Sequence, residues 1–136
     1  MLAWRRITNG STITFPFGED AIGILIYTED LKMAVQMLSA NRPRIDSSDA
    51  LGGDVQQRAA AYSTCLAYFG SYVVQGDKII HQVDGSLFPN WSATMQARPF
   101  AYDGTVLVLS TPPVESAGVS VVNEISWIRL ASANNS

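Results

Sequence analysis

The sequence predicts an all-β domain, folded as a mostly antiparallel meander barrel with one short helix covering an end. Short runs of β-branched and aromatic residues recur at the roughly 8–12-residue spacing of successive antiparallel strands, with turn residues between them. The one long interruption, residues 39–65, begins with polar, turn-forming residues and continues with a helix signal. A chain of 136 residues fits a single domain, here expected over 1–130, and residues 131–136 are expected to form a disordered tail.

The expected strands fall into a weaker and a stronger group. The two near the N-terminus, 3–8 and 11–15, carry the weaker signal. Several of the stronger ones, such as "IGILIYT" and "TVLVLST", are apolar at nearly every position, so we expect both of their faces to be covered. The stronger group comprises residues 22–28, 33–38, 68–74, 79–88, 94–102, 105–111 and 121–130.

Two dipeptides predict tight hairpins. Gly76-Asp77 and Asp103-Gly104 are typical of two-residue loops, which need a positive φ at one or both positions. Each loop implies a register between its two strands. In these registers Tyr72 faces His81, Phe69 faces Asp84, Arg98 faces Leu109 and Phe100 faces Leu107.

The helix is predicted from a capping pattern. Residues 39–53, "SANRPRIDSSDALGG", are polar and turn-rich, and Asp54 with Gln57 then forms a D-x-x-Q signal for a helix near 54–65. In a β meander, a long loop with a single helix often covers one end of a barrel and acts as a lid. The alternative is an excursion over the surface.

Composition and motifs exclude several classes of function. A net charge of -3 without a basic block argues against nucleic-acid binding. Cys65 is the one cysteine, so no disulfide can form within the chain. The N-terminal segment lacks the apolar core of a secretion signal, and no segment is apolar for the roughly 20 residues that span a bilayer. We therefore expect a soluble, cytoplasmic protein without membrane association. Phosphate-loop, H-E-x-x-H and nucleotide-binding patterns are missing from the sequence, so we expect neither a metal nor a cofactor.

His81, the one histidine, is the best candidate for a catalytic group. Asp84 lies three residues further on and so points to the opposite face of a regular strand. The hairpin register instead places Tyr72 beside His81 among aliphatic residues, where desolvation can tune a histidine for general acid or base catalysis. The alternative is a neutral histidine hydrogen-bonded within the barrel wall.

Polar residues within the apolar strands are candidate ligand-binding groups, because burying them is costly unless each finds a partner. Arg98 is the candidate for holding an anionic or carbonyl oxygen, since its guanidinium presents several fixed donors; the alternative is a salt bridge to Asp84 or Glu124. Trp91 is expected after the His81 strand, where it either closes over a ligand at the barrel mouth or caps the core. The other substrate-binding candidates are Tyr27, Gln36, Tyr68, Asp84, Gln96 and Glu124.

Three segments together resemble the lipocalin-like domain family of small β-barrel proteins from bacteria and fungi. They are "FPFGEDAIGILIYTEDLKMAVQM", "AYFGSYVVQGDKIIHQVDGSLFPNWSATMQARPF", and "LVLSTPP" followed by "VVNEISWIRL", with "PFGEDAIG" and H-x-V-x-x-S-L-F-P-N-W as the most specific parts. The resemblance implies a curled barrel whose cavity takes a small apolar or amphipathic molecule. Family members in fungal natural-product pathways suggest cofactor-free isomerase, cyclase or dehydratase roles, whereas others only bind.

The sequence departs from the family pattern in two places. Where members carry a first strand like L-x-G-T-W-x-L, this chain opens with Met1-Leu2-Ala3-Trp4, so we expect a less closed barrel with an edge that a second subunit can meet in a homodimer. Leu31 occupies a turn position where glycine is usual, so that turn is expected to be strained or differently shaped.

The leading hypothesis is a cofactor-free natural-product tailoring enzyme. His81 with Tyr72 would move a proton and Arg98 would stabilise an oxygen, which suffices for isomerisation, cyclisation or dehydration. The rival hypothesis is a binding or carrier protein that holds a similar ligand without changing it. A third is a structural domain whose interior is filled by its own side chains.

Overall fold

The structure is a computed structural model that describes residues 1–131; residues 132–136, and with them most of the predicted tail, lie outside the described residues. The described part of the chain contains ten strands, one α-helix and one 3-10 helix. In chain order they are β1 (Ala3–Thr8), β2 (Thr12–Thr14), β3 (Ile22–Tyr27), β4 (Lys32–Leu38), α1 (Val55–Ser63), β5 (Cys65–Gln75), β6 (Lys78–Ser86), η1 (Pro89–Trp91), β7 (Thr94–Tyr102), β8 (Val106–Ser110), β9 (Val114–Ser116) and β10 (Val119–Ile128).

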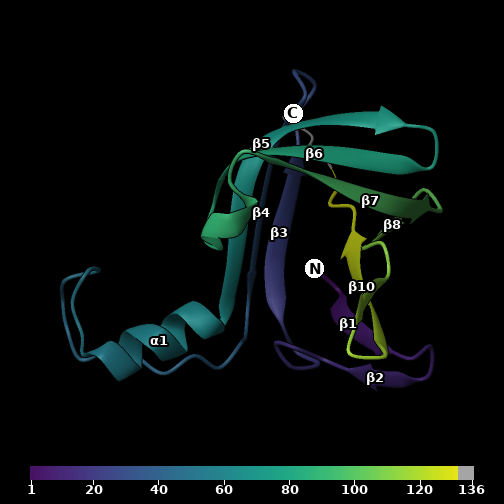
Figure 1. Cartoon of the computed structure of the whole chain (residues 1–136). Helices are drawn as coiled ribbons and strands as arrows, with labels where there is room; N and C mark the ends of the chain where they lie inside the picture. The colour runs from purple at the N-terminus through teal and green to yellow at the C-terminus, as the bar shows by residue number, and fades with distance from the viewer. Residues whose placement is uncertain (132–136) are drawn as a thin grey trace.

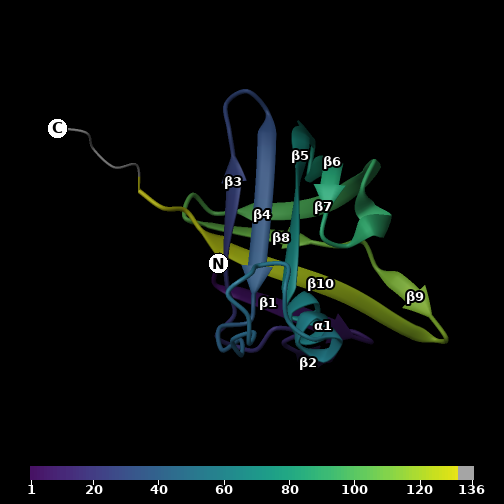
Figure 2. The same ribbon diagram turned by 90° about the vertical axis from the view of Figure 1, so that its left-hand side faces the viewer.

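The strands form one antiparallel sheet that curls on itself (Figures 1 and 2). From β3 to β8 each strand pairs with the next one in the chain, and β10 then pairs with β8. β1 joins β10 from the other end of the sequence, β2 extends the sheet beyond β1, and β9 pairs with the start of β10. The predicted all-β, mostly antiparallel fold with one α-helix is confirmed.

The curled sheet has an open side. β3 lies at one edge of the sheet and β2 at the other. Figure 1 shows β3 facing the pair of β1 and β10 across this side, where the Met1 amino group donates a hydrogen bond to the Gly23 carbonyl oxygen at 3.1 Å. The outer edge of β3 thus has no strand partner within the described residues, and its coverage by a second subunit stays a prediction.

The β5–β6 hairpin has the predicted loop. Gly76-Asp77 connects the strands, Gly76 has a φ of 59°, and Tyr72 lies opposite His81 as predicted. This register places both side chains on the inner face of the sheet.

The prediction that Phe69 faces Asp84 is wrong, because a β-bulge interrupts the pairing. Phe69 pairs with Gly85 and Gly70 with Val83, which leaves Asp84 as the extra residue of β6. Gly70 permits the close approach of the two strands, since a Cβ atom at this position would collide with a backbone carbonyl of β6.

The β7–β8 hairpin turns one residue later than predicted. The Asp103 carboxylate accepts hydrogen bonds from the backbone N–H groups of Thr105 (2.8 Å) and Val106 (2.7 Å), which moves the tip of the loop to Gly104-Thr105. The expected pairs Arg98–Leu109 and Phe100–Leu107 are therefore wrong. Phe100 pairs with Leu109 and Tyr102 with Leu107, and because each partner moves by two residues, the same side chains still face inward.

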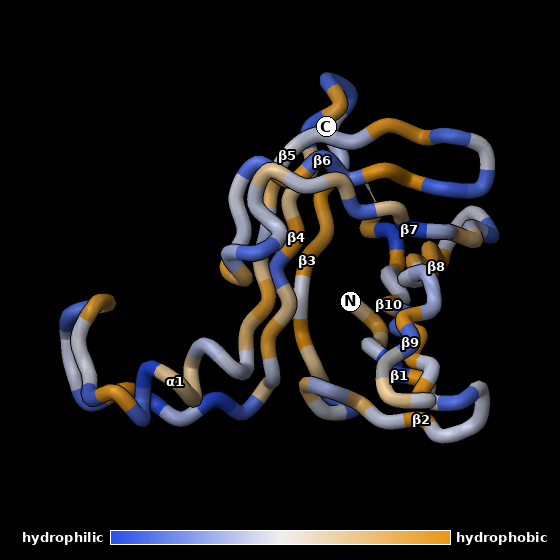
Figure 3. Tube along the Cα trace, in the orientation of Figure 1, coloured by the Kyte–Doolittle hydropathy of each residue, from blue (hydrophilic) through white to orange (hydrophobic). Residues whose placement is uncertain are grey.

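The predicted helix is α1, but it does not cover an end of the barrel. The Asp54 side chain accepts from the backbone N–H of Gln57, and the Gln57 side chain accepts from that of Asp54, so the expected capping box is present. Yet α1 and the loop before it project from the foot of β4 and β5 (Figures 1 and 3), and no residue of α1 is buried. The sequence "VQQRAAAYS" contains mainly alanines and polar residues, so α1 has no broad apolar stripe to bury.

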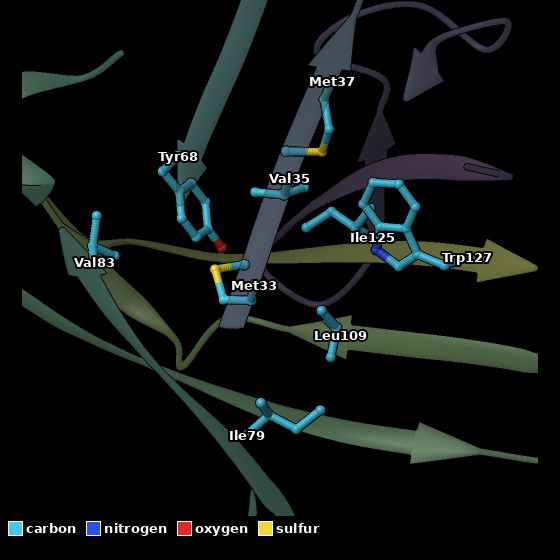
Figure 4. Packing of buried hydrophobic residues seen from close by; sticks show 9 residues of the cluster. All are labelled: Met33, Val35, Met37, Tyr68, Ile79, Val83, Leu109, Ile125 and Trp127. Atoms are coloured by element: carbon cyan, nitrogen blue, oxygen red, sulfur yellow. The ribbon is translucent and has the colours of Figure 1, made fainter. Parts of the chain in front are cut away.

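The core is built from the inward-facing residues of the strands. In β4, for example, Met33, Val35 and Met37 are buried, whereas Lys32 and Gln36 between and beside them are exposed. Figure 4 shows the central cluster, which consists of Met33, Val35, Met37, Tyr68, Ile79, Val83, Leu109, Ile125 and Trp127.

The turn between β3 and β4 has the strained shape that was expected at Leu31. Leu31 has a φ of 64°, a left-handed conformation that is unfavourable for a leucine. Its carbonyl oxygen accepts a hydrogen bond from the backbone N–H of Tyr72 at 3.0 Å, which ties the turn to β5.

The one α-helix of the described residues is too short to reach across a lipid bilayer.

Candidate ligand-binding site

A cavity of about 710 Å³ lies at the open side of the sheet, between β3 and the end of β10. Residues 23–27 of β3 all line it, so the cavity reaches around the edge of that strand. Its wall is mostly apolar, and the one charged side chain in the lining is Arg129. Five aromatic side chains from four strands contribute to the wall: Tyr27, Tyr72, Phe100, Tyr102 and Trp127.

His81 lies directly behind this cavity, fully buried, between two tyrosines. The Tyr27 hydroxyl is 2.6 Å from His81 Nε2, and the Tyr68 hydroxyl is 2.9 Å from His81 Nδ1. Tyr27 lines the cavity, whereas Tyr68 and His81 do not. The three residues therefore form a hydrogen-bonded relay, Tyr27–His81–Tyr68, that begins at the cavity wall and leads into the core.

Burial sets the protonation state of the relay. Burial, and to a lesser extent the positive charge of nearby Arg98, together lower the pKa of His81 to about 4. Burial also raises the pKa values of Tyr27 and Tyr68 above the ordinary range, although Arg98 acts in the opposite direction on both. At neutral pH all three side chains are uncharged, so one tyrosine donates to His81 and the other accepts from it.

Tyr72 lines the cavity but does not contact His81 through its hydroxyl. That hydroxyl donates to the backbone carbonyl oxygen of Thr28 at 2.9 Å, and the Tyr72 ring packs against Tyr27 with 4.6 Å between ring centroids. The register thus places Tyr72 opposite His81, as predicted from the hairpin, while the hydrogen-bond partners of His81 come from β3 and from another position in β5.

Arg98 is buried, with 6% of its surface exposed, yet it has no carboxylate partner among the described residues. Its guanidinium donates to the Ala97 carbonyl oxygen at 3.2 Å and to Gln96 Oε1 at 3.4 Å, and it lies over the ring of Trp91 at 5.6 Å from the centroid. The alternative salt bridge to Asp84 or Glu124 is not formed. A buried cation that is balanced only by neutral groups is costly, and its charge acts on the tyrosine and histidine side chains beside it.

Trp91 and Gln96 belong to the layer behind the cavity. Trp91 packs edge-on against Tyr68, with centroids 5.7 Å apart, and carries Arg98 on its face. The Gln96 amide nitrogen donates to Thr94 Oγ1 at 2.8 Å, and its oxygen accepts from Arg98. Neither residue lines the cavity, so Trp91 covers the core behind the His81 layer rather than the cavity mouth.

Three of the predicted binding residues lie away from the cavity. Gln36 is exposed on the outer face of β4, and Asp84 is exposed at the bulge of β6. Glu124 alternates with inward-facing Ile125 and lies 3.7 Å from Arg5 in an ion pair on the outside. None of the three lines the cavity.

Sequence reasoning missed several residues of the cavity wall, notably Phe100, Trp127 and Arg129. Trp127 is buried, and its Nε1 is the one fully buried side-chain polar atom of the described residues that lacks a hydrogen-bond partner. Residues 125 and 127 share the inner face of β10, so strand alternation contains the signal that would have identified Trp127, whereas Arg129 lies just beyond the end of the strand. The placement of β10 across the open side from β3, where both strands line the cavity, has no such local signal.

The comparisons with known proteins agree with this architecture. A family model described as a lipocalin-like domain matches residues 2–130. The chain is 29% identical over 107 residues to the 4'-hydroxy-3'-methoxypropiophenone carrier protein of Aspergillus oryzae, which covers 72% of this chain and 96% of that protein. No solved structure matches the chain significantly.

Proposed function

The chain belongs to the lipocalin-like domain family, and from that premise we propose that it is a carrier, which binds a small oxygenated aromatic molecule in the cavity and releases it unchanged. The cavity is the observation that carries this proposal. Its volume of about 710 Å³ is in the range of small-molecule sites, and its wall is mostly apolar. The similarity to a carrier of an aryl ketone supports a ligand of the same chemical class.

The cavity wall favours an aromatic ligand that carries an acceptor oxygen. Five aromatic side chains offer ring faces and edges for stacked or T-shaped contacts. Arg129 in the lining offers guanidinium N–H donors to an acceptor oxygen of the ligand.

The proposal is tested by binding and recovery of 4'-hydroxy-3'-methoxypropiophenone. Calorimetric titration should give saturable binding, and mass spectrometry after denaturation of the complex should return the compound unchanged. Leu107→Trp, which fills the cavity, should weaken binding at least about tenfold, whereas the matched control Val73→Trp, on the outer face of β5, should not. Binding that is insensitive to Leu107→Trp would place the ligand elsewhere and contradict the proposal.

A second candidate function is cofactor-free proton transfer, and the Tyr27–His81–Tyr68 relay favours it. A ligand proton would pass to the Tyr27 oxygen while the Tyr27 hydroxyl proton passes to His81 Nε2, and return of a proton to another ligand atom would complete an isomerisation. In this candidate Arg98 acts through its charge on the tyrosine oxygens, and Tyr72 serves as cavity wall. The same chemistry underlies cyclisation or dehydration.

The two candidates are separated by deuterium incorporation at the carbon next to the carbonyl of 4'-hydroxy-3'-methoxypropiophenone in D2O, followed by NMR. A carrier leaves the rate of deuterium incorporation equal to the rate in buffer alone. A proton-transfer enzyme accelerates it, and Tyr27→Phe and His81→Gln should then each remove most of the acceleration, while Tyr62→Phe on the projecting helix leaves it intact.

A further inference from the structure

The mouth of the cavity carries a cation that forms no ion pair with the other described residues. Arg129 directly follows β10, lines the cavity, and has no ion-pair partner within residues 1–131. No acidic side chain lines the cavity, although the chain as a whole contains 12 acidic and 9 basic residues. The charge of the lining is therefore opposite in sign to the net charge of the protein.

The guanidinium of Arg129 is held in place from one side. Its Nη1 donates to the Tyr102 hydroxyl oxygen at 3.4 Å, and that hydroxyl donates in turn to the Gly104 carbonyl oxygen at 2.8 Å. The backbone N–H of Arg129 donates to the Thr105 carbonyl oxygen at 2.9 Å, which ties the end of β10 to the same hairpin. Among residues 1–131, one of the five guanidinium N–H donors has a hydrogen-bond partner, which leaves the others to a ligand.

Asp103, the acidic residue of the β7–β8 hairpin, already accepts hydrogen bonds from the backbone of its own turn. The Asp103 carboxylate accepts from the backbone N–H groups of Val106 and Thr105, and these bonds lower the pKa of Asp103. It serves the turn and forms no ion pair with Arg129.

We infer that Arg129 binds the anionic head of an amphipathic aromatic ligand whose apolar body occupies the cavity. This inference rests on the proposed binding function and specifies the ligand class: a carboxylate, sulfonate or phenolate at the mouth, and rings against the aromatic wall. Arg129 thus determines both ligand preference and orientation, because the anion stays at the mouth while the apolar end enters first.

Two fluorescent probes test the inference, because they share one ring system and differ in charge. 1-Anilinonaphthalene-8-sulfonate carries a sulfonate, and N-phenyl-1-naphthylamine lacks it. Arg129→Gln should raise the Kd for the sulfonate about three- to tenfold and leave the Kd for the uncharged probe within about twofold. It should also remove the decrease in sulfonate affinity that added salt causes in the unsubstituted protein.

The controls separate charge from packing and from folding. Arg58→Gln removes a cation from the projecting helix and should change neither probe. Arg129→Lys keeps the charge and should retain most of the sulfonate affinity if Arg129→Gln acts through charge, with folding of each variant checked by circular dichroism.

Equal loss of both probes, or unchanged sulfonate binding in Arg129→Gln, would overturn the role of Arg129. A different pair of results would count against the proposed use of the cavity itself. In that case the uncharged probe would not bind the unsubstituted protein, and Leu107→Trp would not change binding of the sulfonate. The failures of the two proposals are therefore distinguishable.

Discussion

His81 couples its protonation to folding, because both of its ring nitrogens are occupied by tyrosine hydroxyls and none of its surface reaches solvent. A second proton would turn the acceptor nitrogen into a donor, so the tyrosine that donates to it would have to turn its hydroxyl proton away and accept instead. It would also place a charge beside Arg98, which already has no anionic partner in the described part of the chain. The folded state therefore favours neutral His81.

We predict that the preference of the folded state for neutral His81 makes the protein less stable as the pH falls from about 6.5 to about 4. The pKa of His81 is about 4 in the folded state, against 6.5 for an ordinary histidine side chain, so the unfolded state binds more protons over this window. The loss attributable to His81 should reach about 2 kcal/mol at pH 5 and about 3 kcal/mol near pH 4. The measurement is urea unfolding at pH 7.5, 6 and 5 for the unsubstituted protein and His81→Gln.

The variant should be less stable at pH 7.5, because it loses hydrogen bonds to the tyrosines, but it should lose less stability on acidification. Protonation of carboxylates contributes equally to both proteins and cancels in the difference. Parallel dependence of stability on pH in the two proteins would mean that His81 is not the group responsible.

For single residues, sequence reasoning identified His81 and Tyr72 as neighbours because a two-residue loop sets the register of adjacent strands. It did not pair Tyr27 with His81, since β3 and β6 are not adjacent in the sheet and their side chains meet only across the curled interior. Gln36 shows the opposite case: it alternates with Val35 and Met37, so its outward direction follows from strand periodicity alone.

Among the elements, the β3–β4 turn stores strain at a single residue. Leu31 is held at a φ of 64° by a backbone hydrogen bond to β5, and 52% of the residue's surface is exposed. A left-handed conformation costs a leucine about 1–2 kcal/mol, whereas glycine adopts it freely but loses more entropy on folding. We predict that Leu31→Gly raises the free energy of unfolding by about 0.5 kcal/mol or more in urea denaturation.

Leu31→Ala is the matched control, because alanine retains the Cβ atom and therefore the strain. It should give no gain. If alanine stabilises the protein as much as glycine does, removal of the exposed apolar side chain is the cause and the backbone is not strained.

The elements also show where local sequence signals end. The capping box of α1 was predictable because Asp54 and Gln57 act within one turn. The bulge at Asp84 was not, because it depends on how closely β5 and β6 approach at Gly70, and a glycine in a strand is compatible with either a regular or a bulged pairing. The later turn of β7–β8 depends on the Asp103 side chain competing for the loop N–H groups.

For the whole molecule, the periodic strand signals predicted the curled antiparallel sheet, and the family pattern predicted its cavity. The open side follows from the sheet order of the described strands, in which β3 pairs only with β4. A strand paired on one side opens locally more easily than one paired on both. The cavity wall includes this strand along most of its length, so an edge strand of the sheet is also a part that a ligand would contact.

We therefore predict that ligand binding selectively protects β3. In hydrogen exchange followed by mass spectrometry, peptides covering residues 22–27 should exchange quickly in the free protein and gain protection with N-phenyl-1-naphthylamine. The gain should approach the factor 1 + [ligand]/Kd if the state with β3 detached does not bind the probe, which is about 100-fold at 100 times Kd. Peptides covering α1 should exchange at the same rate with and without the probe, since α1 projects from the sheet and does not line the cavity. If instead β3 exchanges unchanged under saturating probe, β3 does not form part of the binding site, and the open side of the sheet is not where this protein holds its ligand.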